Sequence, residues 1–356
     1  MKNLFLTFLL LFSTTIGLKA QNLVYKVDFG VLFDNLEGSA DYTPTRTLFT
    51  AKFAPEIGVK FAEKHQFMVG AVMLQNLGDN NFLTDADYTI YYNFSDANFN
   101  VYAGSFPRAN SIATYPNSFF REDFLFTDNN IEGVMAQYVP NKGNGYIEVY
   151  VDWYGQNQEN RDDEFLFAGS TEFSYCDKLF FFGANALVNH IKNTDLLVDS
   201  YLYERAFYNV YVGTDLQSLM PCLDRFRINF GTNSSLEHKR FDESVEEEPW
   251  ANNLGWQFGF DINWKGAGLK NDFYFGDSQL MYYEQYENDL YWGNQFYQSD
   301  RYNLTELYYE KSWGIVSLKA AMKFHITPDV FANQQLLTLK LNLNQMIKNG
   351  KLVNVR

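Results

Sequence analysis

Apolar and polar residues alternate with a period of two along almost the whole chain. In the first such stretch, every second residue from Leu23 to Phe33 is apolar or aromatic, whereas Lys26, Asp28 and Gly30 occupy the other face. This period is typical of β-strands with one apolar and one polar face. The alternation predicts sixteen strands, at residues 23–33, 49–61, 66–77, 86–95, 98–106, 131–139, 146–154, 164–174, 179–190, 202–214, 225–237, 254–264, 269–283, 302–311, 315–326 and 335–346. Because the strands at 164–174, 269–283 and 302–311 carry large apolar residues on both faces, fourteen strands is the alternative count.

The connections between these strands are alternately short and long. Short ones at 63–65, 96–97, 141–145, 175–178, 265–268 and 312–314 are separated by longer ones. Outer-membrane β-barrels have short periplasmic turns, longer external loops and an even number of strands. The predicted fold is therefore all-β: a transmembrane antiparallel up-and-down barrel. A secreted β-sandwich or propeller is the alternative, but it has no reason to separate its loops in this way.

One of the longest irregular connections, Gly104–Asn130, is rich in Phe, Tyr and Pro. A long connection without secondary structure inside a compact chain is usually functional or disordered. This composition is too aromatic for a solvated linker, so we expect the loop to fold into the lumen and narrow it. Its charged residues would form the constriction: Arg108, Arg121, Glu122, Asp123 and Asp128.

The composition agrees with a barrel. Aromatic residues make up 18% of the chain, with 25 Tyr and 34 Phe, yet the mean hydropathy is only −0.30. A barrel wall combines these properties because lipid-facing apolar residues alternate with polar residues that face the lumen.

The first twenty residues have the features of a secretory signal. Lys2 precedes the apolar run Leu4–Phe12, which is too short to span a bilayer, and the segment ends at Ala20. We expect cleavage after Ala20, an outer-membrane location and one barrel domain over residues 21–356; an uncleaved anchor is the alternative. Without Lys2 and Lys19, 26 basic and 43 acidic side chains remain, a net charge of −17, which argues against nucleic acid as a partner.

If the apolar face of each strand meets lipid, the polar face lines the lumen. A predicted basic wall consists of Lys26, Lys52, Lys60, Lys319, Lys323 and Lys340, together with Arg225 and Arg227. A predicted acidic wall consists of Glu132, Glu148 and Asp152. Such walls create a field across a constriction that orders passing solutes. The alternative is that these charges pair with one another and make the wall rigid.

The two cysteines, Cys176 and Cys222, fall in turns on the same side of the barrel, one hairpin apart. Because the periplasm permits disulfides, the two are candidates for a disulfide bond, although their separation can exceed the geometric limit.

Catalytic and metal-binding motifs such as HExxH, GxSxG or a spaced Cys/His cluster are absent from the sequence. We therefore expect no enzyme activity, catalytic residue, metal or cofactor. His190 and His238 fall near the external rim beside Asp195 and Glu237, so a hydrolase at the rim stays as an alternative.

The signal, the sixteen alternating segments and the long third external loop resemble the general porins of Gram-negative outer membranes. The aromatic content and the start at Gln21 are similar to those of Bacteroidetes outer-membrane proteins, and the basic tail KNGKLVNVR departs from barrels that end in Phe. The resemblance implies a passive channel for small polar solutes, narrowed by the third loop, with outer-membrane lipid and such solutes as partners and a homotrimer as the assembly. The alternative is a non-conducting barrel subunit of a secretion, surface-anchoring or nutrient-uptake complex.

Overall fold

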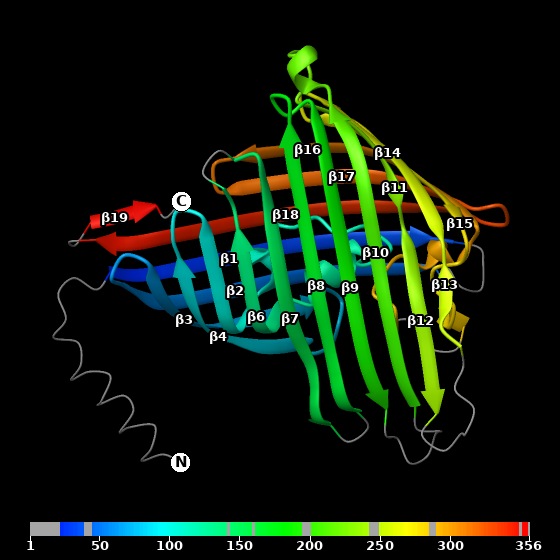
Figure 1. The fold of residues 1–356 in the computed structure, drawn as a ribbon. Coiled ribbons are helices and arrows are strands. Elements are labelled where there is room, and N and C mark those ends of the chain that lie inside the picture. The colour runs from blue at the N-terminus through cyan, green and yellow to red at the C-terminus, as the bar shows by residue number, and fades with distance from the viewer. Residues whose placement is uncertain are drawn as a thin grey trace.

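The chain forms a closed antiparallel β-barrel in a computed structural model (Figure 1). The model describes residues 22–38, 45–140, 143–158, 161–193, 201–241, 249–284, 290–348 and 351–354. The strands are β1 (Asn22–Glu37), β2 (Arg46–Phe61), β3 (His65–Asn76), β4 (Asp85–Ser95), β5 (Phe99–Pro107), β6 (Asn130–Tyr138), β7 (Gly145–Gln158), β8 (Arg161–Tyr175), β9 (Phe180–Asn193), β10 (Tyr201–Asp215), β11 (Arg225–Thr232), β12 (Ser234–Phe241), β13 (Ala251–Asn253), β14 (Gly255–Trp264), β15 (Ala267–Gly276), β16 (Arg301–Trp313), β17 (Val316–Ile326), β18 (Phe331–Lys348) and β19 (Lys351–Asn354). The helical segments are η1 (Arg108–Asn110), α2 (Glu122–Thr127), η2 (Gln217–Leu219) and η3 (Gln295–Gln298).

The barrel closes because β1 pairs with both β2 and β18, with Leu23 opposite Ile347. β11 and β12 are two parts of one wall strand, since both pair with β10. β13 and β14 likewise form one wall strand, because β13 pairs with β12 and β14 pairs with β11. The wall therefore has sixteen strands, which confirms the predicted fold class and excludes the count of fourteen. β19 adds a short hairpin to β18.

The faces of the strands follow the predicted alternation. On β1, Val24, Leu32 and Asp34 are buried inside the barrel, whereas Leu23 and Phe29 lie on the exposed side. An outer face of exposed large apolar residues is what contact with lipid requires. Among the described residues, no helix is long and apolar enough to cross a membrane.

Several strand boundaries differ from the prediction. The strand expected at 269–283 ends at Gly276, whose φ of +148° suits glycine and where a Cβ would meet the Leu254 carbonyl oxygen at 2.3 Å. The chain turns into the barrel after that glycine. The connection expected at 156–163 is shorter, because β7 and β8 extend to Gln158 and Arg161. The strand expected at 225–237 is interrupted at Asn233.

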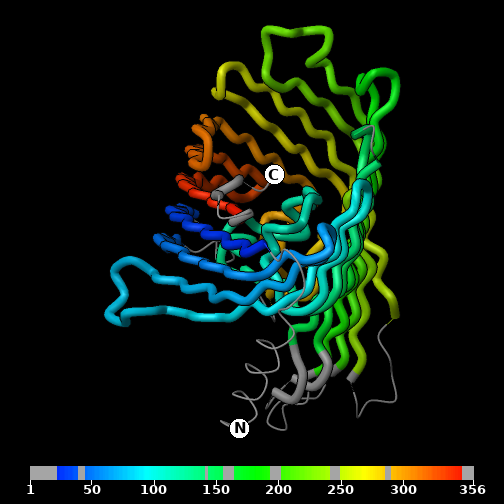
Figure 2. Tube along the Cα trace, turned by 90° about the vertical axis from the view of Figure 1, so that its left-hand side faces the viewer, coloured from blue at the N-terminus to red at the C-terminus, as the bar shows by residue number. Residues whose placement is uncertain are grey.

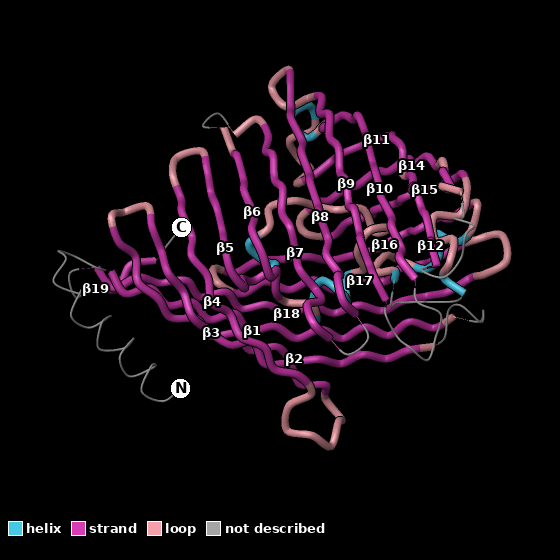
Figure 3. The backbone as a smooth tube through the Cα atoms, turned by 60° about the horizontal axis from the view of Figure 1, so that its bottom comes forward, coloured by secondary structure: helices cyan, strands magenta, loops and turns pink. Residues whose placement is uncertain are grey.

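Two segments between strands fold into the lumen. We call residues 108–129 the first inward segment and residues 277–300 the second inward segment, of which 277–284 and 290–300 are described. Figures 2 and 3 show both between the strands of opposite walls. Their buried apolar residues, most of them aromatic, form one cluster with the wall: Phe119, Phe120, Leu280, Leu290, Tyr291, Trp292, Phe296 and Tyr297 pack with Tyr150, Tyr203, Phe207 and Tyr302. The interior at this level is therefore a packed core.

The two ends of the barrel differ. We call the end at residues 62–64, 96–98, 176–179, 265–266 and 314–315 the short-turn end and the opposite end the long-loop end. By the general rule for such barrels, the short-turn end faces the periplasm and the long-loop end faces outward.

Candidate functional site

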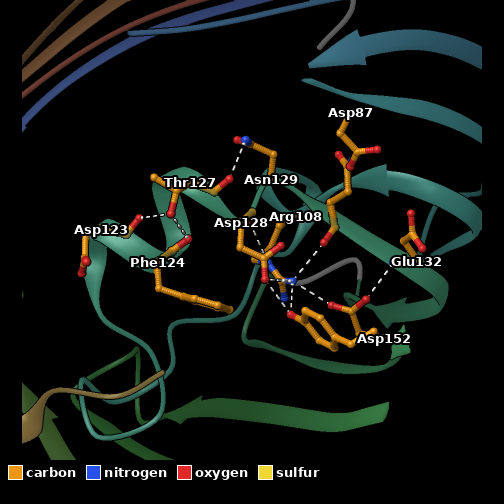
Figure 4. A network of polar contacts seen from close by, with 11 residues as sticks. Asp87, Arg108, Asp123, Phe124, Thr127, Asp128, Asn129, Glu132 and Asp152 are labelled. Carbon is orange, nitrogen blue, oxygen red and sulfur yellow. Dashed lines mark hydrogen bonds and ion pairs between the residues drawn. The ribbon is translucent and has the colours of Figure 1, made fainter. Parts of the chain in front are cut away.

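Arg108 fixes the first inward segment to the wall (Figure 4). One guanidinium nitrogen lies 2.7 Å from Asp152 on β7 and 3.1 Å from Asp128. The same group donates to the Tyr154 hydroxyl at 2.7 Å and to the Asn130 carbonyl oxygen at 2.9 Å. Arg108 is only 6% exposed, and a buried charge needs such partners because it has lost its water.

The helix α2, at the other end of the segment, contacts the opposite wall of the barrel. Glu122 lies 3.4 Å from Lys319 and 3.0 Å from Lys323, both on β17. Asp123 lies 2.9 Å from Arg46 on β2. Lys52 donates to the Asn129 side chain at 2.6 Å. These contacts start from strands on the far side of the lumen from β7, so the segment spans the barrel.

These ion pairs set the charge of α2. Burial raises the pKa of Glu122, but Lys323 and Lys319 outweigh burial and hold it below its ordinary value. Burial would raise the pKa of Asp123 in the same way. The charges of Arg121 and Arg46 outweigh burial, so the pKa of Asp123 also lies below its ordinary value. Both carboxylates are therefore charged at neutral pH.

The second inward segment closes over the first. The Arg121 amide donates to the Trp292 carbonyl oxygen at 2.7 Å, and the Asn294 amide donates to the Asn117 carbonyl oxygen at 2.7 Å. The Trp292 ring stacks on Phe124 at a centroid distance of 5.3 Å. The sequence predicted a strand up to residue 283 and an external loop after it, and the missed signal is the high content of aromatic residues that also identified the first segment.

Two cavities remain beside the inward segments. A cavity of about 310 Å³ is lined by the first inward segment and by wall residues toward the short-turn end, such as Glu172, Tyr211, Arg227 and Asp261. A smaller crevice of about 30 Å³ lies between α2 and the wall, beside Arg46, Lys323 and Gln334.

Most residues of the predicted basic wall form hydrogen bonds or ion pairs with neighbouring side chains of the barrel. Lys26 donates to the Tyr91 hydroxyl at 3.1 Å, and Lys319 lies 2.7 Å from Glu306. Arg225 pairs with Asp261 and Glu310, and Arg227 pairs with Glu172. Lys60 is half-buried and Lys340 is exposed.

The residues predicted for the acidic wall have different positions. Glu148 accepts from the Ser111 hydroxyl at 2.5 Å and from the Gln137 amide at 2.7 Å. Asp152 holds Arg108. Glu132 is exposed and shares the outer side of β6 with Val134, so it does not line the lumen with the other two.

Both cysteines, Cys176 and Cys222, are exposed and unbonded. The structure therefore lacks the disulfide for which they were candidates. Among the described residues, no group of His, Cys, Asp and Glu is arranged to hold a metal ion.

Comparisons with solved structures find other outer-membrane barrels. OmpTdeltaL8, a loop L8 deletion mutant of the outer membrane protein OmpT of Vibrio cholerae, is 9% identical with a TM-score of 0.52, over 91% of this chain and 100% of that chain. The outer membrane protein OprD from Pseudomonas aeruginosa is 11% identical with a TM-score of 0.48, over 92% of this chain and 94% of that chain. At such low identity the first similarity supports the barrel fold alone. No curated protein matches the chain.

A family model described as "Lipid A 3'-O-deacylase-type" matches residues 17–351, which include all sixteen wall strands. This description names an enzyme activity, so the expectation that the chain is not an enzyme is wrong. The motifs sought in the sequence belong to other enzyme families, and their absence was therefore no guide. The chain belongs to the lipid A 3'-O-deacylase-type family.

Proposed function

We propose that this protein is an outer-membrane hydrolase that removes an ester-linked acyl chain from a lipid A-type glycolipid. The observation that carries the proposal is the match to the deacylase-type family over residues 17–351. The barrel supports it, because a transmembrane wall holds the chain among its lipid substrates. We also propose that residues 1–20 direct export and are cleaved after Ala20; they lie outside the described residues.

The filled lumen agrees with an enzyme better than with a wide diffusion pore. The inward segments bury Phe119, Phe120 and Tyr291 against the wall and against each other. A packed interior gives a barrel the rigidity that a site on its wall needs, because catalytic groups must keep their positions.

The test is the acylation state of lipid A. The protein would be expressed in a Gram-negative host whose lipid A carries ester-linked chains, and the extracted lipid A would be analysed by mass spectrometry. We expect a species lighter by one acyl chain and an equivalent amount of free fatty acid, both missing from cells with the empty plasmid. Unchanged lipid A in cells that hold the folded barrel would refute the proposal.

A passive channel for small polar solutes is the second candidate. The cavity of about 310 Å³ supports it, since charged side chains such as Arg227 and Lys270 line it and suit hydrated solutes. A continuous path would have to pass the two inward segments. Single-channel conductance in a planar bilayer separates this candidate from a closed barrel.

A further inference from the structure

Three polar side chains form a row across the outer surface of the barrel. Glu204 on β10 lies opposite His190 on β9 and opposite His238 on β12 in the strand register. The Nδ1 atom of His190 lies 3.4 Å from one carboxylate oxygen of Glu204, and the Nδ1 atom of His238 lies 3.5 Å from the other. The carboxylate thus lies between two imidazoles, within ion-pair distance of each when that imidazole is protonated.

The row faces lipid and not the lumen. It shares the face of β9 and β10 with Val188 and Val210, which are 39% and 43% exposed. The alternate residues Asn189, Tyr203 and Arg205 are at most 1% exposed and lie inside the barrel. Polar side chains on a lipid-facing wall cost little near the membrane interfaces, so it is the placement of one carboxylate between two imidazoles that suggests a function.

Aromatic rings continue the row on both sides. His190 stacks on Phe165 at 4.9 Å, and Phe165 stacks on Trp153 at 5.5 Å. On the other side, His238 stacks on Trp250 at 4.8 Å. Rows of Trp and other aromatic residues mark the level of lipid headgroups on outer-membrane barrels. The row therefore interrupts the aromatic girdle toward the long-loop end, at the depth where the acyl esters of a glycolipid lie.

The neighbours of the row suit an amphipathic substrate. Two residues along each strand toward the long-loop end, Lys192 and Arg240 flank Leu202 on the same outer face. Two residues along each strand toward the short-turn end, Val188 and Leu236 flank Ala206. An anionic headgroup would meet the basic residues, and acyl chains would meet the apolar ones.

We propose that His190, Glu204 and His238 form an ester-hydrolysing site on the lipid-facing surface, and that an acyl ester of an outer-leaflet glycolipid reaches it laterally from the membrane. This inference rests on the proposed function and adds the place and the residues. The Nδ1 side of the His190 ring faces Glu204, which leaves Nε2 on the far edge of the ring for a water molecule. His190 is the base because its side chain is 26% exposed, compared with 8% for His238.

The reaction is a hydrolysis that consumes one water. His190 takes a proton from the water as its oxygen bonds to the acyl carbonyl carbon, and Glu204 stabilises the imidazolium that forms. The bond between the acyl carbonyl carbon and the sugar oxygen then breaks, and the imidazolium gives the proton to that leaving alkoxide oxygen. The products are a free fatty acid and a sugar hydroxyl. Glu204 is a positioning residue that acts through His190.

The experiment uses the full-length barrel, folded in detergent and vesicles, with two probes: lipid A that carries ester-linked chains, and 4-nitrophenyl palmitate. We expect His190→Gln to lower kcat on both probes by about 100-fold or more. Glu204→Gln should lower kcat more than it changes KM and should move the acidic limb of the pH–rate profile, whereas Glu204→Asp should restore part of the rate. A merely structural role for Glu204 would not move that limb.

The matched control is His65→Gln. His65 also lies at a strand end, stacks on Phe61 at 5.4 Å and bonds the Tyr92 hydroxyl at 2.6 Å, but it has no carboxylate partner among the described residues and lies at the short-turn end. This variant should keep wild-type activity. Heat-dependent mobility on gels would show that each barrel is folded.

The outcomes separate the two proposals. Full activity of folded His190→Gln on lipid A would overturn the row as the site and leave the proposed function intact. Cleavage of the nitrophenyl ester but not of lipid A, with loss in His190→Gln, would support the site and refute the substrate. Cleavage of neither probe by the wild-type protein would overturn both.

Discussion

At the residue scale, Arg108 shows how one side chain ties the interior of the barrel together. It joins the first inward segment to β7 through Asp152, and its other partners, Asp128 and Tyr154, also bond each other at 2.7 Å. Several residues of the predicted basic wall likewise pair with carboxylates beside them, as Arg227 does with Glu172. The alternative considered from the sequence, that lumen charges pair and stiffen the wall, describes these residues.

Replacement of Arg108 by Met should lower the free energy of unfolding by about 3–5 kcal/mol, because it leaves the buried Asp152 carboxylate without its partner. Urea unfolding of the folded barrel in detergent measures this. Lys64→Met is the control: Lys64 and Asp96 form an exposed pair at 2.9 Å, whose loss should cost less than about 1 kcal/mol. Equal effects of the two variants would contradict the role of Arg108.

Acid should weaken the attachment of α2. Because Arg121 and Arg46 hold the pKa of Asp123 below its ordinary value of 3.8, its charge stabilises the folded state at neutral pH. That contribution is lost as the pH falls below 3.8 and the carboxylate takes up a proton. The difference in urea midpoint between wild type and Asp123→Asn should therefore be largest near pH 7 and shrink in acid. A difference that stays constant down to pH 3 would contradict this pKa.

At the element scale, the two inward segments depend on each other. They are in tight contact at Gly293, where an added Cβ would lie 1.9 Å from the Ser118 carbonyl oxygen. The Ser118 hydroxyl in turn donates to Asn233 at 2.7 Å, the residue that interrupts the wall strand between β11 and β12. The interruption is thus one of the points at which the first inward segment binds the wall.

Gly293→Ala should separate the segments and destabilise the barrel by about 1–3 kcal/mol, the usual cost of overpacking. Hydrogen exchange should rise in both segments and not in the wall. Gly169→Ala is the matched control, since its methyl group would meet only Val149 Cγ1, at 3.6 Å, and a carbonyl oxygen at 3.8 Å. Unchanged exchange in the second segment of Gly293→Ala would show that the two segments are independent.

At the scale of the whole molecule, the barrel is a rigid transmembrane wall around a packed interior. This arrangement leaves two surfaces for function, the lumen and the lipid-facing side. The channel candidate uses the first surface and the proposed hydrolase site lies on the second, so the two are tested separately.

Deletion of residues 116–128 should raise single-channel conductance in a planar bilayer above that of the wild type, because it removes the part of the first segment that spans the lumen. Deletion of 79–82 is the control, because this loop includes Phe82, which is 92% exposed, and lies away from the lumen. Discrete openings of the wild type would support the channel. A folded deletion variant that conducts no better than the wild type would show that the second segment alone closes the barrel.

The sequence by itself determined the wall. A period of two is a local property, and the alternation of short and long connections can be read residue by residue, so the fold class, a count of sixteen or fourteen strands and an inward loop after the fifth strand follow from the sequence alone. The loop is shorter than the predicted Gly104–Asn130, because β5 extends to Pro107 and β6 begins at Asn130. The second inward segment was predictable in principle from its aromatic content, but the alternation up to Tyr283 suggested a longer strand.

Only the tertiary structure decided which side chains meet. The sequence placed His190 and His238 near the rim but associated them with Asp195 and Glu237. Glu237 instead faces the interior and accepts from Tyr203 and Tyr291 at 2.6 Å, and Asp195 lies outside the described residues. Glu204 reaches both histidines because strand register, a relation between residues far apart in the chain, sets it opposite each of them. Register and the packing of the lumen depend on long-range contacts, which no local pattern of residues contains.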